Sequence, residues 1–139
     1  MNRIVFVILV VAGFNFSSAQ NIFGKWKTID DETGETKSIV EIYENDGKVY
    51  GKIVDILTDN RDAICSKCED DKKDKPVLGM VIIDGLKKDD EAYEGGTILN
   101  PENGKVYKCR LKIEEDEDTL QVRGYVAFFY KTQYWERVD

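Results

Sequence analysis

Short runs of alternating apolar and polar residues follow one another along most of the chain, and no stretch keeps a helical period. In residues 105–114, Tyr107, Cys109 and Leu111 fall on one face, while Lys108 and Arg110 fall on the other. A period of two with a charged opposite face predicts a strand that is buried on one side and solvated on the other. The same pattern recurs in residues 119–128, where one face collects Leu120, Val122, Gly124, Val126 and Phe128.

Turn-forming residues divide these runs into eight predicted strands. They cover residues 24–29, 38–44, 48–57, 77–83, 96–99, 105–114, 119–128 and 132–138. The connections are short, so sequential strands should pair in antiparallel fashion. We therefore predict an all-β fold, an eight-stranded antiparallel up-and-down β-barrel, because closure also removes the exposed edges of the sheet.

One connection is long, the segment from Thr58 to Pro76 between the third and fourth strands, and more than half of its residues are charged. A long connection inside a small domain is usually a functional lid or a disordered tether. This segment carries two of the three cysteines. We favour a lid that its cysteines hold in place.

The N-terminus has the layout of a secretory signal peptide, with Arg3 ahead of an apolar run from Ile4 to Phe14 and small residues up to Ala19. We predict a signal peptide at residues 1–19, cleaved after Ala19, and a single domain at residues 20–139. A buried strand or an N-terminal anchor is the alternative. The run is too short to span a bilayer, which takes about 20 residues.

The chain is acidic, with a formal net charge of −7, and it contains no histidine. An acidic protein is poorly suited to nucleic acids or anionic lipid surfaces, which need basic counter-charge. The lack of histidine removes Ser-His and Cys-His nucleophile pairs and the commonest zinc and haem ligand. We therefore expect no catalytic residues, no metal and no cofactor.

Cys65 and Cys68 form the one motif with chemical content. In an exported chain, a Cys65–Cys68 disulfide is our first choice, since a short ring closes at little entropic cost. A bridge from either one to Cys109 is the second. A thioredoxin-like redox pair and a zinc site stay open as alternatives, although no helix follows the motif to lower a thiol pKa and no second Cys-x-x-Cys supplies further ligands. Cys109 is otherwise a small buried apolar residue.

Aromatic residues near both ends of the domain suggest how the barrel closes. Trp26 and Trp135 could line a ligand site, but aromatic residues at strand spacing are more often core. Arg137 could stack on an aromatic ring and donate hydrogen bonds to carbonyl groups at the closed end of the barrel. We favour this structural role over ligand binding.

Eight sequence elements in order resemble the bacterial domain-of-unknown-function family 2147 across nearly the whole predicted mature chain. They are Gly24-Lys25-Trp26-Lys27-Thr28, Gly51-Lys52-Ile53-Val54, Cys65-x-x-Cys68, Pro76-Val77-Leu78-Gly79-Met80, Gly95-Gly96-x-Ile98-x-x-Pro101, Gly104-Lys105-x-Tyr107, Leu120-x-Val122-Arg123-Gly124-Tyr125 and Thr132-Gln133-x-Trp135-x-Arg137-Val138. The resemblance implies an exported barrel of lipocalin-like (calycin-like) type. It also implies the lipocalin closure, in which Arg137 packs on Trp26 next to Gly24. It carries over no catalytic residue.

The leading hypothesis is a non-catalytic binding module for a small apolar ligand in the cell envelope, either periplasmic or secreted. An eight-stranded barrel has room for side chains or one small ligand. The expected lining residues are Val49, Ile53, Tyr107, Leu111 and Phe128. The alternatives are a structural or protein-interaction role with a filled interior and, third, an enzyme.

Overall fold

The structure is a computed structural model that describes residues 21–138. The predicted signal peptide at residues 1–19 lies outside the described residues. No helix within the described part has the length and apolar composition that crossing a membrane requires.

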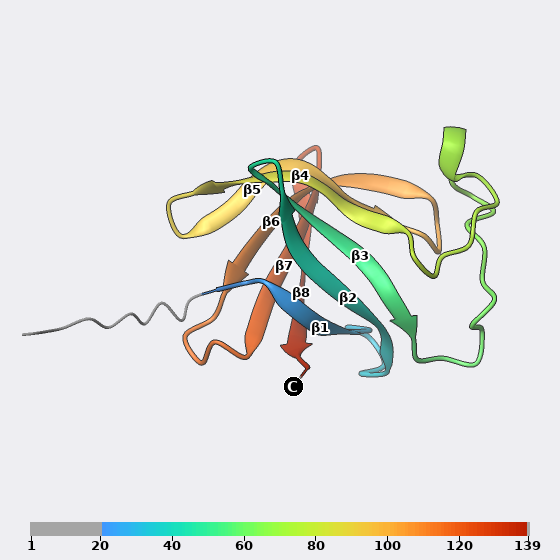
Figure 1. Cartoon of the computed structure of the whole chain (residues 1–139), viewed down its shortest axis with the longest axis horizontal. Helices are drawn as coiled ribbons and strands as arrows, with labels where there is room; N and C mark the ends of the chain where they lie inside the picture. Colours follow the sequence, from blue (N-terminus) through green and yellow to red (C-terminus); the bar gives the residue numbers. More distant parts are fainter. Residues whose placement is uncertain (1–20, 139) are drawn as a thin grey trace, which may run out of the picture.

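Eight antiparallel strands form one closed barrel in sequence order, which confirms the predicted fold. Figure 1 shows the strands crossing at steep angles around a common interior. Their bounds are β1 Gly24–Ile29, β2 Thr36–Asn45, β3 Lys48–Ile56, β4 Val81–Asp89, β5 Ala92–Asn100, β6 Lys105–Ile113, β7 Thr119–Val126 and β8 Phe129–Arg137.

The pairing register of the strands determines which side chains form the core. Leu111 on β6 lies opposite Val122 on β7, and Leu120 on β7 lies opposite Trp135 on β8. Residues directly opposite one another in an antiparallel pair share a face. The inward faces therefore collect the buried apolar side chains, and no polar or charged residue of the described chain is buried.

The barrel closes where β8 pairs with β1, through Trp26 opposite Arg137 and Lys27 opposite Glu136. This seam is short compared with β2 and β3, which pair along almost their full lengths. The last residues of the described chain lie beside β1 in Figure 1, where the backbone N–H of Val138 donates to the carbonyl of Lys25.

The fourth and fifth strands have different bounds from those that the sequence predicts. β4 begins at Val81 and runs to Asp89, whereas residues 77–83 were expected. The strand starts later than predicted because Gly79, at a φ of +90°, interrupts the extended backbone. It ends later than predicted because the strand continues past Asp84, with charged residues on its solvated outward face. β5 is longer than predicted because it bends at Gly95 and Gly96 without ending there.

Gly96 shows why the sheet needs a glycine at that bend. A Cβ atom there would lie 2.1 Å from the backbone carbonyl oxygen of Asp84 on β4. Only a residue without a side chain lets β4 and β5 approach so closely. The strong curvature that closes a barrel of eight strands is therefore partly encoded at this position.

Candidate functional site

A cavity of about 790 Å³ lies at one end of the barrel. This volume is within the range of small-molecule sites, which occupy about 300–1,000 Å³. The connections β1–β2, β3–β4, β5–β6 and β7–β8 surround its opening. We call this end the mouth, and it comprises residues 30–35, 57–80, 101–104 and 127–128.

Aliphatic side chains form most of the inner wall of the cavity. The apolar residues lining it below the mouth are Ile53, Ile56, Ile82, Ile98, Leu99, Val122 and Trp135. All of them except the half-buried Ile98 are buried. Such a wall offers dispersion contacts and no charge, and it therefore suits an apolar guest.

A few uncharged polar groups are set into this wall. The hydroxyl oxygens of Thr28 and Ser38 lie 2.8 Å apart. The indole N–H of Trp135 donates to Oε1 of Gln133 over 3.2 Å, and the amide of Asn103 donates to the phenol oxygen of Tyr107 over 3.3 Å. All of these side-chain groups are uncharged hydroxyl, amide or indole groups. They can orient a guest without requiring that it be charged.

The rim of the mouth carries an ion-pair network centred on Lys37. Its ammonium group contacts the carboxylates of Asp30, at 3.6 Å, and Glu102. β2 and β5 are separated by two strands around the barrel, so the contact between Lys37 and Glu102 reaches across the mouth. The hydrogen bond to Glu102 raises the pKa of Lys37 above its usual value, and Asp30 adds to this effect.

Asp30 is held in place by its own turn. The backbone N–H groups of Glu32 and Thr33 donate to its Oδ1 at 2.8 and 3.1 Å. These two hydrogen bonds lower the pKa of Asp30, because they stabilise the carboxylate form. A second ion pair, between Lys131 and Asp31 at 3.3 Å, joins β8 to the same turn.

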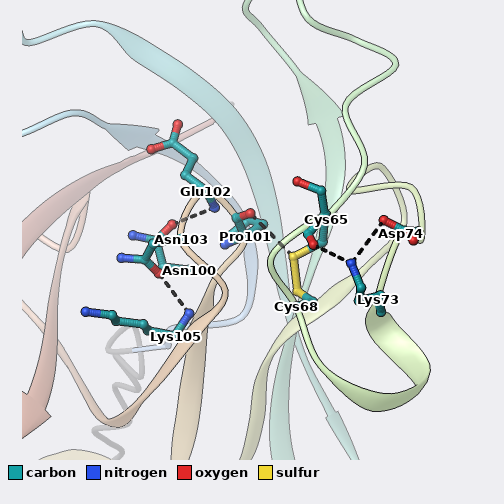
Figure 2. The surroundings of a disulfide bond; sticks show 10 residues. Cys65, Cys68, Lys73, Asp74, Asn100, Pro101, Glu102, Asn103 and Lys105 are labelled. Atoms are coloured by element: carbon teal, nitrogen blue, oxygen red, sulfur yellow. Dashed lines mark hydrogen bonds and ion pairs between the residues drawn. A yellow bond between two sulfur atoms is a disulfide. The ribbon is translucent and has the colours of Figure 1, made fainter.

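The Cys65–Cys68 disulfide is present, as the first choice from the sequence predicted. Two sulfur atoms bonded to one another cannot serve as thiolate ligands, so the zinc alternative and the bridge to Cys109 do not describe this structure. Figure 2 shows the disulfide beside the β5–β6 turn, with Sγ of Cys65 3.4 Å from the carbonyl oxygen of Pro101.

The loop that contains the disulfide is folded on itself. The backbone N–H of Cys65 donates to Lys75, that of Asp74 to Cys65 and that of Val77 to Ala63, each over 2.9 Å. A 3-10 turn, Asp70–Lys72, lies at its outer end, away from the barrel in Figure 1. Ala63, Ser66 and Val77 line the cavity, so the loop forms one side of the mouth.

Gly104 allows the loop and the β5–β6 turn to touch. A Cβ atom at Gly104 would lie 1.9 Å from the carbonyl oxygen of Lys67, and its φ of +74° is one that other residues rarely adopt. The peptide beside the disulfide therefore rests directly on this turn. The disulfide fixes the shape of the loop segment that forms this contact.

Cys109 is the free cysteine of the described chain, with 2% of its surface exposed. Burial raises the pKa of its thiol to about 12, so the reactive thiolate is scarce at neutral pH. Cys109 therefore packs as a small apolar residue, as expected.

The number of reactive thiols should differ among folded, unfolded and reduced protein. We expect protein made in an oxidising compartment to show no reactive thiol when folded, one after unfolding without reductant and three after reduction, in an assay with a thiol-specific chromophore. Protein that is alkylated only after unfolding serves as the control, because it shows whether air has oxidised thiols during handling. Three thiols in the unreduced unfolded sample would rule out the disulfide.

Trp26 and Arg137 lie together at the end of the barrel opposite the mouth. The guanidinium carbon of Arg137 lies 4.3 Å from the centre of the Trp26 ring, next to Gly24. Arg137 also donates hydrogen bonds to the carbonyl oxygens of Asn21 and Phe23, at 2.9 and 3.2 Å. This arrangement matches the structural role that we favoured for Arg137.

The structure places the other predicted site residues in three different environments. Ile53 and Tyr107 line the cavity. Val49 and Leu111 are buried core residues that do not line it. Trp135, expected at the seam, lies on the strand next to β1 but also lines the cavity.

The inward position expected for Phe128 is wrong, because 95% of this residue is exposed. β7 ends at Val126, and Ala127, with a φ of +54°, turns the chain. The alternation that places Leu120 and Val122 inside therefore stops before Phe128. With Phe129 and Tyr130, which are 74% and 60% exposed, Phe128 forms an aromatic tip beside the mouth.

A second depression, of about 810 Å³, lies near the closed end. Most of its lining is charged or polar, including Lys88, Glu91 and Lys112, and Lys112 pairs with Glu91 over 3.7 Å. A surface of this kind remains hydrated. The cavity at the mouth, with its aliphatic inner wall, is therefore the candidate functional site.

Comparison with known proteins places this geometry in context. Residues 24–137 match the model of the family DUF2147, which is described as "Uncharacterized protein conserved in bacteria". No curated protein matches the chain. Among solved structures, the chain is similar to protein HP1028 from the human pathogen Helicobacter pylori, which is described as belonging to the lipocalin family. The two chains are 21% identical, with a TM-score of 0.75 over 86% of this chain and 84% of the other.

Proposed function

We propose that this chain, which belongs to the bacterial family DUF2147, binds a small apolar molecule in the cavity of its lipocalin-like barrel without transforming it chemically. One observation carries the proposal, namely a cavity of about 790 Å³ whose inner wall is aliphatic and whose mouth opens to solvent. Interiors without a ligand role are normally packed to native density, without space of this size.

The polar groups of the cavity are suited to orienting a guest more than to catalysis. The two lysines of the lining are paired with carboxylates at the rim, and the inner wall supplies hydroxyl and amide groups. A nucleophile with an adjacent base, which covalent catalysis requires, does not occur among the residues that line the cavity. This lining supports a binding role.

The proposal includes a location, in the periplasm or outside the cell, and cleavage of a signal peptide after Ala19. The Cys65–Cys68 disulfide supports this location, because disulfides persist in oxidising compartments. The N-terminal apolar run supports it independently.

A titration with N-phenyl-1-naphthylamine, an uncharged probe whose fluorescence rises in apolar surroundings, tests the proposed function. We expect a saturable rise in fluorescence with a dissociation constant of about 1–10 µM, as partial burial of two aromatic rings would give. A non-binding protein of similar acidity is the control for nonspecific enhancement. A rise that does not saturate, together with no bound mass in native mass spectrometry, would contradict a binding role.

The alternative is an interaction role, and one observation favours it. The aromatic tip, residues 128–130, exposes large apolar side chains that solvent does not favour. Phe129 and Tyr130 of this tip also line the cavity, whereas Phe128 does not. Loss of partner binding in Phe128→Ser with full probe binding would assign the interaction to the part of the tip that lies outside the cavity.

A further inference from the structure

We propose that the cavity selects uncharged apolar molecules carrying a hydroxyl, ester or amide group, and discriminates against anionic amphiphiles of the same length. The inference rests on the proposed function, since it names the class of ligand. Three features of the mouth and the wall support it, namely the charge balance, the pairing of the lysines and the neutral polar groups.

The charge balance of the cavity lining is negative. Four carboxylates and two ammonium groups line it: Asp30, Asp31, Glu32 and Glu102 against Lys37 and Lys131. Two negative charges are therefore in excess. All six belong to the rim, and salt screens their interaction with a headgroup at the mouth over a Debye length of about 8 Å at physiological ionic strength.

Both lysines of the lining already have carboxylate partners. Lys37 lies between Asp30 and Glu102, and Lys131 pairs with Asp31. A ligand carboxylate at the remaining N–H of Lys37 would lie beside the carboxylates of Asp30 and Glu102, and it could otherwise bind only by exchange with one of them. That exchange brings no net gain of charge-assisted hydrogen bonds, and it moves the ligand charge towards the remaining acids.

Glu32 adds to this repulsion. Its carboxylate forms no ion pair within residues 21–138, and it lies on the turn that also presents Asp30 and Asp31. The turn holds its shape through hydrogen bonds from the backbone to Asp30. The Asp30 carboxylate is therefore held at the mouth, and the ion pair with Lys131 holds Asp31 beside it.

The wall below the rim can satisfy an uncharged polar group. When Thr28 and Ser38 share one hydrogen bond, one hydroxyl hydrogen is left over. The phenol of Tyr107 accepts from Asn103 and keeps its own hydrogen to donate. A ligand hydroxyl, ester or amide oxygen can accept from such donors, and burying a neutral polar group costs far less than burying a charge.

Competition against the bound probe tests this selection. Dodecanol and dodecanoate have equal chain lengths and differ in the charge of the polar end at about pH 7.5, where a carboxylic acid is ionised. The alcohol partitions better into any apolar site, so the informative quantity is how the ratio of the two affinities changes. We measure it at about 20 mM and about 500 mM NaCl, because salt screens the charges at the rim.

We expect dodecanol to compete more strongly, and its advantage to shrink about three- to ten-fold at high salt. Glu102→Gln should shrink it by a similar factor at low salt, because it removes one rim charge and leaves Lys37 with Asp30 as its one carboxylate partner. Adding Lys37→Met to Glu102→Gln should restore the original preference. Glu44→Gln, at an exposed position on the opposite end of β2, is the matched control and should change nothing.

The outcomes distinguish a failure of ligand binding from a failure of the charge selection. If neither the probe nor dodecanol binds, the proposed function fails and the inference fails with it. If both bind but the ratio is independent of salt and of Glu102→Gln, only the charge selection is wrong. Stronger competition by dodecanoate than by dodecanol would overturn the selection directly.

Discussion

Replacing Trp26 with alanine is expected to lower the free energy of unfolding by about 3–5 kcal/mol, the range for truncating a fully buried large aromatic residue. Trp26 has no exposed surface, and its indole N–H donates to the carbonyl of Ile22 over 2.8 Å. The substitution removes this ring from the core and leaves the carbonyl of a buried residue without its donor. Chemical denaturation, followed by circular dichroism, measures the change.

The effect should be large because Trp26 is linked to the seam of the barrel. Arg137 stacks on its ring and donates to the carbonyl of Glu117 over 3.0 Å, in addition to its bonds with the N-terminal segment. β1 and β8 share few backbone pairs, so these side chains hold much of the closure. Removing the ring weakens several of these contacts together.

Two further measurements make the Trp26 prediction specific. Phe128→Ala removes an exposed aromatic residue, and we expect a change within about 0.5 kcal/mol. Trp26 does not line the cavity, so folded Trp26→Ala should retain its affinity for the probe. A folded and stable variant that has lost probe binding would show that Trp26 belongs to the binding site.

Replacing Gly124 with tryptophan is expected to reduce the affinity for the apolar probe at least ten-fold, or about 1.4 kcal/mol, while the barrel remains folded. Gly124 lies on β7 and lines the cavity. A Cβ atom there would meet Cβ of Tyr107 at 3.4 Å and Cγ2 of Ile98 at 3.8 Å, which are ordinary contacts. The backbone therefore accepts a side chain at this position, and its ring must occupy the cavity.

The matched control puts the same ring on the outer face. Lys108 is exposed on β6, the strand next to Gly124, and Lys108→Trp should leave the probe affinity unchanged. Probe titration and thermal unfolding of both variants provide the comparison. Full binding by Gly124→Trp, with its circular dichroism spectrum preserved, would place the probe outside the barrel and contradict the proposed site.

Most of the fold could be predicted, because alternation and turn residues act locally. The strands with clear alternation, such as the one containing Tyr107 and Leu111, were located to within a residue or two. Prediction failed where glycine does not end a strand, as at Gly95 and Gly96 in β5, and where an apolar segment is not a strand, as at Val77. In these places tertiary packing determines the backbone, and the local pattern does not.

The candidate site was predicted less well than the fold. Ile53 and Tyr107 could be assigned to the interior by alternation, but alternation does not distinguish the packed core, where Leu111 lies, from the wall of a cavity. The rim pair of Lys37 and Glu102 joins residues 65 positions apart. No local pattern links them. The one available signal is that polar residues in alternate connections meet at one end of an up-and-down barrel.

The short seam between β1 and β8 also has a consequence for the order of folding. Most neighbouring strands are joined by tight hairpins, which form through local contacts, whereas the contacts of Arg137 with Phe23 span 114 positions. Such long-range contacts form late, because the entropy of closing a large loop opposes them until the intervening strands have assembled. During synthesis, β1 emerges first and must wait for the last strand before its outer edge is paired. Closure of the barrel therefore completes the folding of this chain.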